Sequence, residues 1–167
     1  MQDVHEMAAA LEERAQAVDQ LQVNGALVEA LAPVAGEHIL EVGCGSGVLS
    51  RQVAPGVVPG GKITGVDISP EFLKIAQGYV ASTDFPTSFQ WSAGQAEVLP
   101  FQDASFDGVF AARLLLHVSN PRSVLNELTR VTRPGGRVVV MDWDFDTVAI
   151  PENKKLEAKA TVIQIKR

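Results

Sequence analysis

The sequence is poor in features that define whole classes of protein. Its 167 residues include one cysteine, Cys44, which excludes an internal disulfide and a zinc site built from several cysteines. No apolar run approaches the ~18 residues of a membrane-spanning helix, because Arg113 interrupts the longest candidate, Val109 to Val118. Residues 1–13 lack the basic and then apolar pattern of a secretory signal. These absences predict a cytoplasmic protein with no membrane span.

Positive charge is also scarce. The chain has 14 Lys and Arg against 20 Asp and Glu, a formal net charge of -6, and a sequence pI near 5.0. This balance disfavours a general affinity for nucleic acid or for an acidic membrane surface. Hydrophobic residues make up 46% of the chain, enough to bury a core, which argues against intrinsic disorder. We expect a single globular domain over residues 1–167.

Short runs rich in Val, Ile or Phe alternate with helical patterns along the middle of the chain. The runs predict strands buried on both faces, and they are His38–Val42, Lys62–Ile68, Phe89–Gly94, Phe106–Ala112 and Arg137–Asp144. Ser69–Pro70 and Asn120–Pro121 each place a helix N-cap before a proline at the first helical position. Strands that alternate with helices predict an α/β fold with a doubly wound, mostly parallel sheet.

The two ends of the chain give weaker patterns. Residues 1–32 predict helices: Leu11, Ala15 and Val18 share one helical face, and Asn24–Gly25 predicts a break before a second, short helix. Residues 33–145 form the predicted core. Residues 146–167 remain ambiguous, because Leu156, Ala160 and Ile163 fit a helix face whereas Thr161–Ile165 fits a strand.

A glycine loop follows the first predicted strand. Gly43, Gly45 and Gly47 alternate, and Glu41 lies two residues before the first of them. The spacing differs from the dinucleotide fingerprint, which would need glycine where Val48 stands, and no Gly-Lys-Ser/Thr follows as in a phosphate loop. Such a loop lets the backbone approach a ligand closely.

Asp67 ends the second predicted strand, 20 residues beyond the glycine loop. A carboxylate at this place in an α/β fold can accept hydrogen bonds from both hydroxyls of a ribose. The alternative is an acid that only favours the start of the helix after Ser69–Pro70.

Four segments together resemble the motifs of class I S-adenosylmethionine-dependent methyltransferases. They are Ile39–Gly47, Gly65–Ser69, Gly94–Phe101 with the following Ser105–Asp107, and Val131–Arg137. The resemblance is greatest to the branch that includes ubiquinone and menaquinone biosynthesis C-methyltransferases and many small-molecule methyltransferases. It implies a Rossmann-like fold and S-adenosylmethionine as the cofactor.

The resemblance also implies a role for each motif residue. The methionine part of the cofactor would be held by Glu41, Gly43, Cys44, Gly45 and Gly47, with the backbone around Arg113 near its amino group. The adenosine part would be held by Asp67 at the ribose, Ile68 packed on the adenine, Ala96 through its backbone N–H, and Gln95. Gln95 stands where this branch usually has Asp, and its amide oxygen can still accept the bond from the exocyclic amine.

The acceptor side is less defined. His117 is the candidate general base, although a histidine that caps or packs the following loop is the favoured interpretation. No metal site is expected, because Ala111–Arg113 stands where catechol-type enzymes have an acid, although Asp142, Asp144 and Asp146 alternate at the end of the fifth predicted strand. No N-P-P-Y-type motif of the enzymes that methylate adenine in nucleic acid follows the fourth strand, which leaves a small-molecule methyl acceptor as the expected partner. The alternatives are a cofactor-binding fragment without turnover and a nicotinamide-dependent oxidoreductase. The oxidoreductase is disfavoured by Val48 and by the lack of a Tyr-x-x-x-Lys pair.

The sheet of this family continues with an antiparallel pair of strands after a fifth helix. Here the predicted strands end at Asp144, so few residues remain for that pair. We therefore expect the C-terminal antiparallel strands to be missing. The fifth strand would then be an exposed edge and a surface for self-association.

Overall fold

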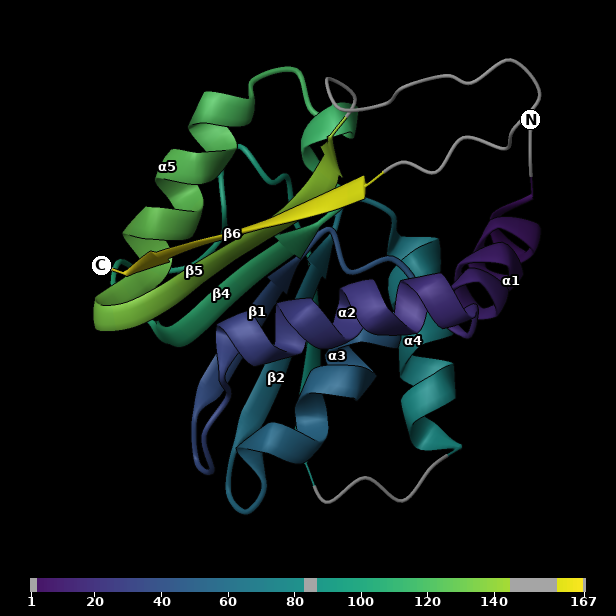
Figure 1. Cartoon of the computed structure of the whole chain (residues 1–167), viewed down its shortest axis with the longest axis horizontal. Coiled ribbons are helices and arrows are strands. Elements are labelled where there is room, and N and C mark those ends of the chain that lie inside the picture. Colours follow the sequence, from purple (N-terminus) through teal and green to yellow (C-terminus); the bar gives the residue numbers. More distant parts are fainter. Residues whose placement is uncertain (1–2, 83–86, 145–158, 167) are drawn as a thin grey trace.

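The computed structural model describes residues 3–82, 87–144 and 159–166 of the chain. One six-stranded sheet runs through the molecule in the order β3-β2-β1-β4-β5-β6 (Figure 1). Its strands are β1 (His38–Val42), β2 (Lys62–Asp67), β3 (Ser88–Ala93), β4 (Phe106–Ala112), β5 (Thr132–Asp144) and β6 (Lys159–Lys166). β1 to β5 pair in parallel and β6 is antiparallel to β5. The predicted α/β fold with a parallel sheet is confirmed.

Helices cover both faces of the sheet (Figure 1). They are α1 (Val4–Ala15), α2 (Val18–Leu31), α3 (Val48–Val53), α4 (Pro70–Ala81) and α5 (Pro121–Val131), with short 3-10 turns η1 (Ala54–Val57) and η2 (Leu115–His117). Neighbouring strand residues face opposite layers. Ile39 packs with Leu27 and Leu31 of α2, whereas Leu40 packs in the layer that holds Leu128 of α5.

The N-caps read from the sequence form as expected. The Ser69 hydroxyl accepts a hydrogen bond from the Phe72 amide at 3.3 Å, and the Asn120 side chain accepts one from the Ser123 amide at 3.1 Å. Both caps satisfy amides that have no partner inside the helix. They fix where α4 and α5 begin, directly after the loops that follow β2 and β4.

The predicted helix break at Asn24–Gly25 is wrong. α2 runs through both residues, and the break lies at Gln16 and Ala17 instead. The cause is a tertiary contact: Asn24 is 2% exposed, and its side-chain oxygen accepts a hydrogen bond from the Arg113 guanidinium at 3.1 Å. A residue that favours turns is therefore held inside a helix by a partner distant in the sequence.

The expectation of an exposed fifth-strand edge is also wrong. β6 pairs along β5 from Arg137–Lys166 to Asp144–Lys159, so the strand interpretation of Thr161–Ile165 is confirmed and the helix is excluded. Backbone groups of β5 that would otherwise lack partners pair with β6. Self-association through that edge loses its basis. Leu156 lies outside the described residues.

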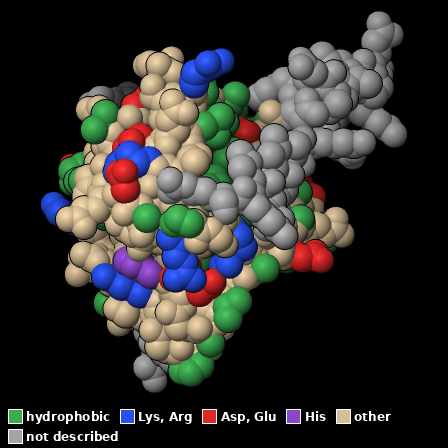
Figure 2. Space-filling view, turned by 90° about the vertical axis from the view of Figure 1, so that its left-hand side faces the viewer, with side chains coloured by type: hydrophobic (Ala, Val, Ile, Leu, Met, Phe, Trp, Pro, Cys, Tyr) green, Lys and Arg blue, Asp and Glu red, His purple; other side chains and the backbone are tan. Residues whose placement is uncertain are grey.

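Charged side chains at the amino ends of the strands pair with one another. Figure 2 views the side that lies at the left of Figure 1 and shows basic, acidic and histidine side chains gathered there. Arg137 pairs with Glu37 at 2.5 Å and Arg133 pairs with Asp107, while the Asp107 carboxylate accepts the His38 amide at 2.7 Å. These contacts join the strand starts to their flanking loops. Among the described residues, no helix is long and apolar enough to cross a membrane.

Gly65 in β2 is required by close packing, and this can be tested. A Cβ at this position would lie 2.4 Å from Cζ3 of Trp91 and 2.9 Å from the Cys44 sulfur. We expect Gly65→Ala to lower the free energy of unfolding by about 1–3 kcal/mol, because the ring and the buried loop must both shift. Chemical denaturation measures the change.

Gly78→Ala is the matched control. Gly78 lies in α4 with open space around the added Cβ, so the same substitution should raise the free energy of unfolding by about 1 kcal/mol through helix propensity. Equal effects of the two substitutions would contradict the packing argument.

Candidate functional site

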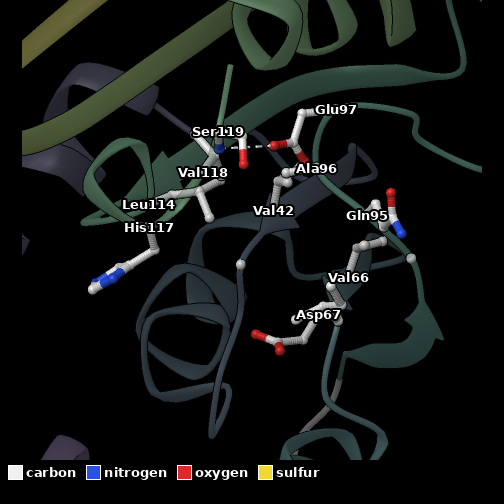
Figure 3. Close-up of a pocket in the computed structure, with 13 residues that line it drawn as sticks. Val42, Val66, Asp67, Gln95, Ala96, Glu97, Leu114, His117, Val118 and Ser119 are labelled. Atoms are coloured by element: carbon white, nitrogen blue, oxygen red, sulfur yellow. Dashed lines mark hydrogen bonds between the residues drawn. The ribbon is translucent and has the colours of Figure 1, made fainter. Parts of the chain in front are cut away.

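Two adjoining cavities lie at the carboxyl ends of the strands. The first has a volume of about 350 Å³ (Figure 3) and the second about 370 Å³. Both are lined by Gly43, Asp67, Ile68, Leu114 and His117. The remaining wall of the first is Val42, Val66, Gly94, Gln95, Ala96, Glu97, Val118 and Ser119. The remaining wall of the second is Met7, Leu11, Arg14, Ala15, Gln20, Asn24, Glu41, Cys44, Gly45, Val48, Leu49, Phe72, Ala112, Arg113 and Trp143.

The glycine loop forms the floor between the cavities. Gly43 and Gly45 have positive φ angles of 75° and 51°, a conformation that glycine adopts readily. The Gly43 and Cys44 amides both donate to the Val66 carbonyl, at 2.8 and 3.0 Å, so the loop is tied to the end of β2. A side chain at Gly43 would lie 2.8 Å from Leu114. Gly43 therefore lines both cavities with its backbone alone.

Gly47 has a different place from the other two loop glycines. It lines neither cavity; it precedes α3 as its N-cap, with a φ of 74°. An added Cβ would lie 2.6 Å from the Trp91 ring. The structure thus gives this glycine a packing role behind the loop, and its predicted contact with the cofactor stays a prediction.

Asp67 lies where the two cavities meet. One of its carboxylate oxygens accepts the Gly45 amide at 2.8 Å and the other accepts the Ser69 amide at 2.9 Å. These bonds fix the side chain, which points into the open space between the surrounding loops in Figure 3. A carboxylate has about four acceptor positions. After two amides are bound, Asp67 can still accept bonds from a ligand.

Ile68, Gln95 and Ala96 line the first cavity; the contacts with adenine that the resemblance implies for them stay a prediction. Ile68 is 72% exposed, which leaves an apolar surface free beside Asp67. The loop after β3 is held against β2 because the Gly94 amide donates to the Asp67 carbonyl at 3.1 Å. Figure 3 shows Gln95 and Ala96 on this loop, across from His117 and Val118.

Glu41 lies beneath the glycine loop, 3% exposed. Burial raises the pKa of its carboxyl to about 8, against the opposing effect of hydrogen bonds from Ser50. The Ser50 hydroxyl donates to the carboxyl at 2.5 Å. Glu41 is consequently mostly protonated at neutral pH, a state that the sequence does not predict.

Cys44 is 4% exposed. Burial raises the pKa of its thiol well above the usual value, and the neighbouring Glu41 and Asp67 act in the same direction. The thiolate is the nucleophilic form of cysteine. This thiol is therefore suited to lining the cavity and unsuited to attack on a substrate.

A charged cluster that sequence reasoning missed holds α1 over the loop. Glu12 in α1 pairs with Arg51 at 2.5 Å and accepts the Ser46 hydroxyl at 2.6 Å. Arg51 also donates to the Ser46 carbonyl at 2.9 Å and lies 4.8 Å from the Tyr79 ring centroid. No local pattern marks a pair separated by 39 residues. α1 thereby closes one side of the second cavity.

Arg113 follows β4 and forms another wall of the second cavity. Its amide donates to the Met141 carbonyl at 2.7 Å. Its guanidinium donates from Nη2 to Gln20 at 2.5 Å and to Asn24 at 3.1 Å. The resemblance implies that the backbone of this residue lies near the cofactor; it implies no role for the side chain or for its two partners on α2.

His117 ends η2 at the rim of both cavities and is exposed. Figure 3 shows its imidazole directed away from Asp67. Among residues 3–82, 87–144 and 159–166, no group of three or more His, Cys, Asp or Glu could hold a metal ion. The Asp142 carboxylate accepts the Leu115 and Trp143 amides, each at 2.9 Å, which gives it a structural role; Asp146 lies outside the described residues.

Comparisons with known proteins find relatives of this chain. A family model described as "Methyltransferase domain" matches residues 40–140. The chain is 41% identical over 118 residues to a 2-phytyl-1,4-naphtoquinone methyltransferase of Synechocystis, covering 71% of this chain and 50% of that protein. It is 38% identical over 107 residues to a demethylmenaquinone methyltransferase of Symbiobacterium thermophilum, covering 64% and 43%.

The chain is also similar to an O-methyltransferase and to a protein of known structure. An O-methyltransferase, resE, of Aspergillus sclerotiorum is 38% identical over 116 residues, covering 70% of this chain and 43% of that protein. Among solved structures, the YcgJ protein of Bacillus subtilis superposes with a TM-score of 0.68 at 26% identity, covering 73% of this chain and 50% of that one. The chain thus spans about half, or less, of the length of these relatives.

The buried carboxyl of Glu41 predicts a pH dependence of stability. Its folded pKa of about 8 exceeds the ordinary 4.5, so between these values the unfolded chain releases a proton that the folded protein keeps. The free energy of unfolding should fall as pH rises through this window, by up to about 1.4 kcal/mol per pH unit from this group. The glutamine side chain of Glu41→Gln cannot titrate, so the free energy of unfolding of this variant should depend less on pH than that of the wild type.

Chemical denaturation at several pH values between about 5 and about 8 checks this expectation. Glu29→Gln, at an exposed position of α2, is the control and should keep the wild-type slope. A slope in Glu41→Gln equal to that of the wild type would show that Glu41 ionises freely in the folded protein.

Proposed function

Because the chain belongs to the class I S-adenosylmethionine-dependent methyltransferases, we propose that it transfers the methyl group of that cofactor to a small-molecule acceptor. The observation that carries the proposal is the junction of two cavities at Asp67 and the bare backbone of Gly43. One cavity suits a nucleoside, and the other leads from the glycine loop to an apolar wall. A cofactor that bridges them would present its reactive end to the second.

The first cavity supports the placement of adenosine. The Asp67 carboxylate, fixed by two amides, is available to accept bonds from the ribose hydroxyls. Ile68 offers an exposed apolar side chain to one face of the adenine. Gln95 and Ala96 lie on the opposite loop, where an amide oxygen and a backbone N–H can meet the adenine edge.

The second cavity supports the placement of the methionine part and the acceptor. When bound, the cofactor supplies a methyl group on a positively charged sulfur that is already electrophilic. The protein therefore has chiefly to hold and align the acceptor, which can lower the barrier by about 7–11 kcal/mol. Met7, Leu11 and Trp143 form apolar walls suited to an organic molecule. The named quinone methyltransferases and O-methyltransferases among the relatives support this class of acceptor.

A methyl-transfer assay with labelled S-adenosylmethionine and a panel of small aromatic, quinol and carboxylic acceptors tests the proposal, with binding measured in parallel by calorimetry. We expect cofactor binding and label transfer to at least one acceptor. Binding without transfer to any acceptor would favour the alternative, a cofactor-binding domain without turnover. Binding of NAD in place of S-adenosylmethionine would overturn the proposal.

Asp67→Ala should weaken binding of S-adenosylmethionine by about 1–3 kcal/mol, the cost of removing a charged hydrogen-bond acceptor. Calorimetric titration measures the change. Asp103→Ala is the control, because Asp103 is exposed and pairs with Arg130 outside both cavities. Unchanged affinity in a folded Asp67→Ala variant would remove the ribose assignment.

His117→Ala should leave kcat/KM within about threefold of the wild type, because the exposed imidazole is directed away from Asp67, whereas removal of a general base costs about 10²–10⁴-fold. Initial rates with the best acceptor of the panel measure the effect. His5→Ala in α1 serves as the control for loss of a surface histidine. A fall of a hundredfold or more would identify His117 as the base.

A further inference from the structure

The Arg113 side chain lines the second cavity without a carboxylate partner. Its Nη2 donates to two neutral amide oxygens, those of Gln20 and Asn24. Within the part of the chain that the structure describes, Nε is buried without an acceptor and no ion pair involves this residue. A buried or half-buried guanidinium is normally paired with an acid. No described side chain supplies such an acid to Arg113.

A second cation lies in the same cavity. Arg14, in the last turn of α1, is exposed, lines the cavity, and has no ion pair among the described residues. Burial lowers the pKa of Arg113, and Arg14 adds to that effect, while Asp142 and Glu41 oppose it. The Asp142 carboxylate accepts two backbone amides instead of the guanidinium, and the Glu41 carboxyl accepts the Ser50 hydroxyl. The wall thus carries two guanidinium groups that form no direct ion pair with any described carboxylate.

The backbone of Arg113 is also unusual, a property that it shares with Ala32 and Ala104. Arg113 has a φ of 56°, in the left-handed region that side chains other than glycine and asparagine rarely adopt. Such strain persists where the surroundings enforce it, and it occurs preferentially at functional sites. This conformation occurs directly after the end of β4, where the Arg113 amide donates a hydrogen bond to the Met141 carbonyl of β5.

The position of Arg113 along the sheet separates it from the adenosine site. The sheet order places β1 between β2, which ends at Asp67, and β4, which leads to Arg113. With neighbouring strands about 4.8 Å apart, the ends of β2 and β4 are separated by about 10 Å. Trp143, one strand further on, lies with its ring 5.7 Å from the Arg113 guanidinium carbon. A cation beside an aromatic face suits a flat organic anion.

We propose that Arg113 is a specificity-determining residue that binds an anionic oxygen of the methyl acceptor, so that the acceptor is a flat, largely apolar organic anion. The inference rests on the proposed function and names its substrate class. The apolar body of the acceptor lies against Trp143 and the α1 side chains Met7 and Leu11, and its carboxylate or ionised hydroxyl lies at the guanidinium. The amides of Gln20 and Asn24 hold the guanidinium in place for this contact.

The test compares two probes of equal size on the full chain saturated with S-adenosylhomocysteine. The probes are 2-naphthoate, which is an anion at neutral pH, and 2-naphthamide, which is neutral. We expect 2-naphthoate to bind about tenfold more tightly than 2-naphthamide or better, because only the former gains a charge-assisted hydrogen bond. Calorimetry, or quenching of tryptophan fluorescence, gives both dissociation constants.

Substitutions then test whether Arg113 causes the preference for 2-naphthoate. Arg113→Gln should abolish the difference between the probes, each titrated at a concentration of S-adenosylhomocysteine that saturates the variant. Arg113→Lys keeps the charge and should retain part of the preference. Arg122→Gln, at an exposed position of α5 outside both cavities, is the matched control and should behave as the wild type.

Equal affinity of the wild type for both probes, with S-adenosylhomocysteine bound normally, overturns the inference alone, and this comparison holds even if Arg113→Gln does not fold. A large loss of S-adenosylhomocysteine affinity in a folded Arg113→Gln also overturns it, because Arg113 would then hold the carboxylate of the cofactor. Failure of the wild type to bind S-adenosylhomocysteine overturns the proposed function, and the inference with it.

Discussion

The hydrogen bonds between the glycine loop and the end of β2 fix the geometry of the whole cleft. One carbonyl, that of Val66, accepts both the Gly43 and the Cys44 amide, and the carboxylate of the next residue, Asp67, accepts the Gly45 amide. The loop cannot move without breaking all three bonds. Asp67 is therefore oriented by the same backbone that a ligand contacts. The floor of the cleft and its charged group form one rigid unit.

Charge is distributed unevenly around this unit. Behind the loop, Glu41 is mostly protonated at neutral pH and Cys44 keeps its proton, because burial disfavours their ionised forms. Asp67 lies at the cleft, and its carboxylate accepts two backbone amides. Across the glycine loop, Arg14 and Arg113 provide positive charge. The cleft thus has an acidic centre and a basic far wall, and a ligand that spans it meets both signs.

The parts of this arrangement that are local in sequence could be predicted, and the others could not. Ser69 and Asn120 cap their helices within three residues, and the five parallel strands follow from short apolar runs. Gly43 and Asp67 reach the cleft because parallel strands end at one edge of the sheet. The continuity of α2 through Asn24 depends on Arg113, 89 residues away, and β6 depends on the unpaired edge of β5. The Glu12–Arg51 pair has no local signature either.

The contacts of Arg113 with α2 have a consequence for local unfolding. The end of α2 that carries Leu27 and Leu31 is anchored in the core, whereas near its start Val18 and Leu21 are exposed and Gln20 is only 6% exposed. The start of the helix can therefore fray only by exposing Gln20, which costs less than global unfolding. Fraying would release Gln20, an acceptor for the guanidinium, with every strand pair left intact. Backbone amides around Gln20 should then exchange with solvent before those of the sheet, and the shape of the cavity would fluctuate on that faster timescale.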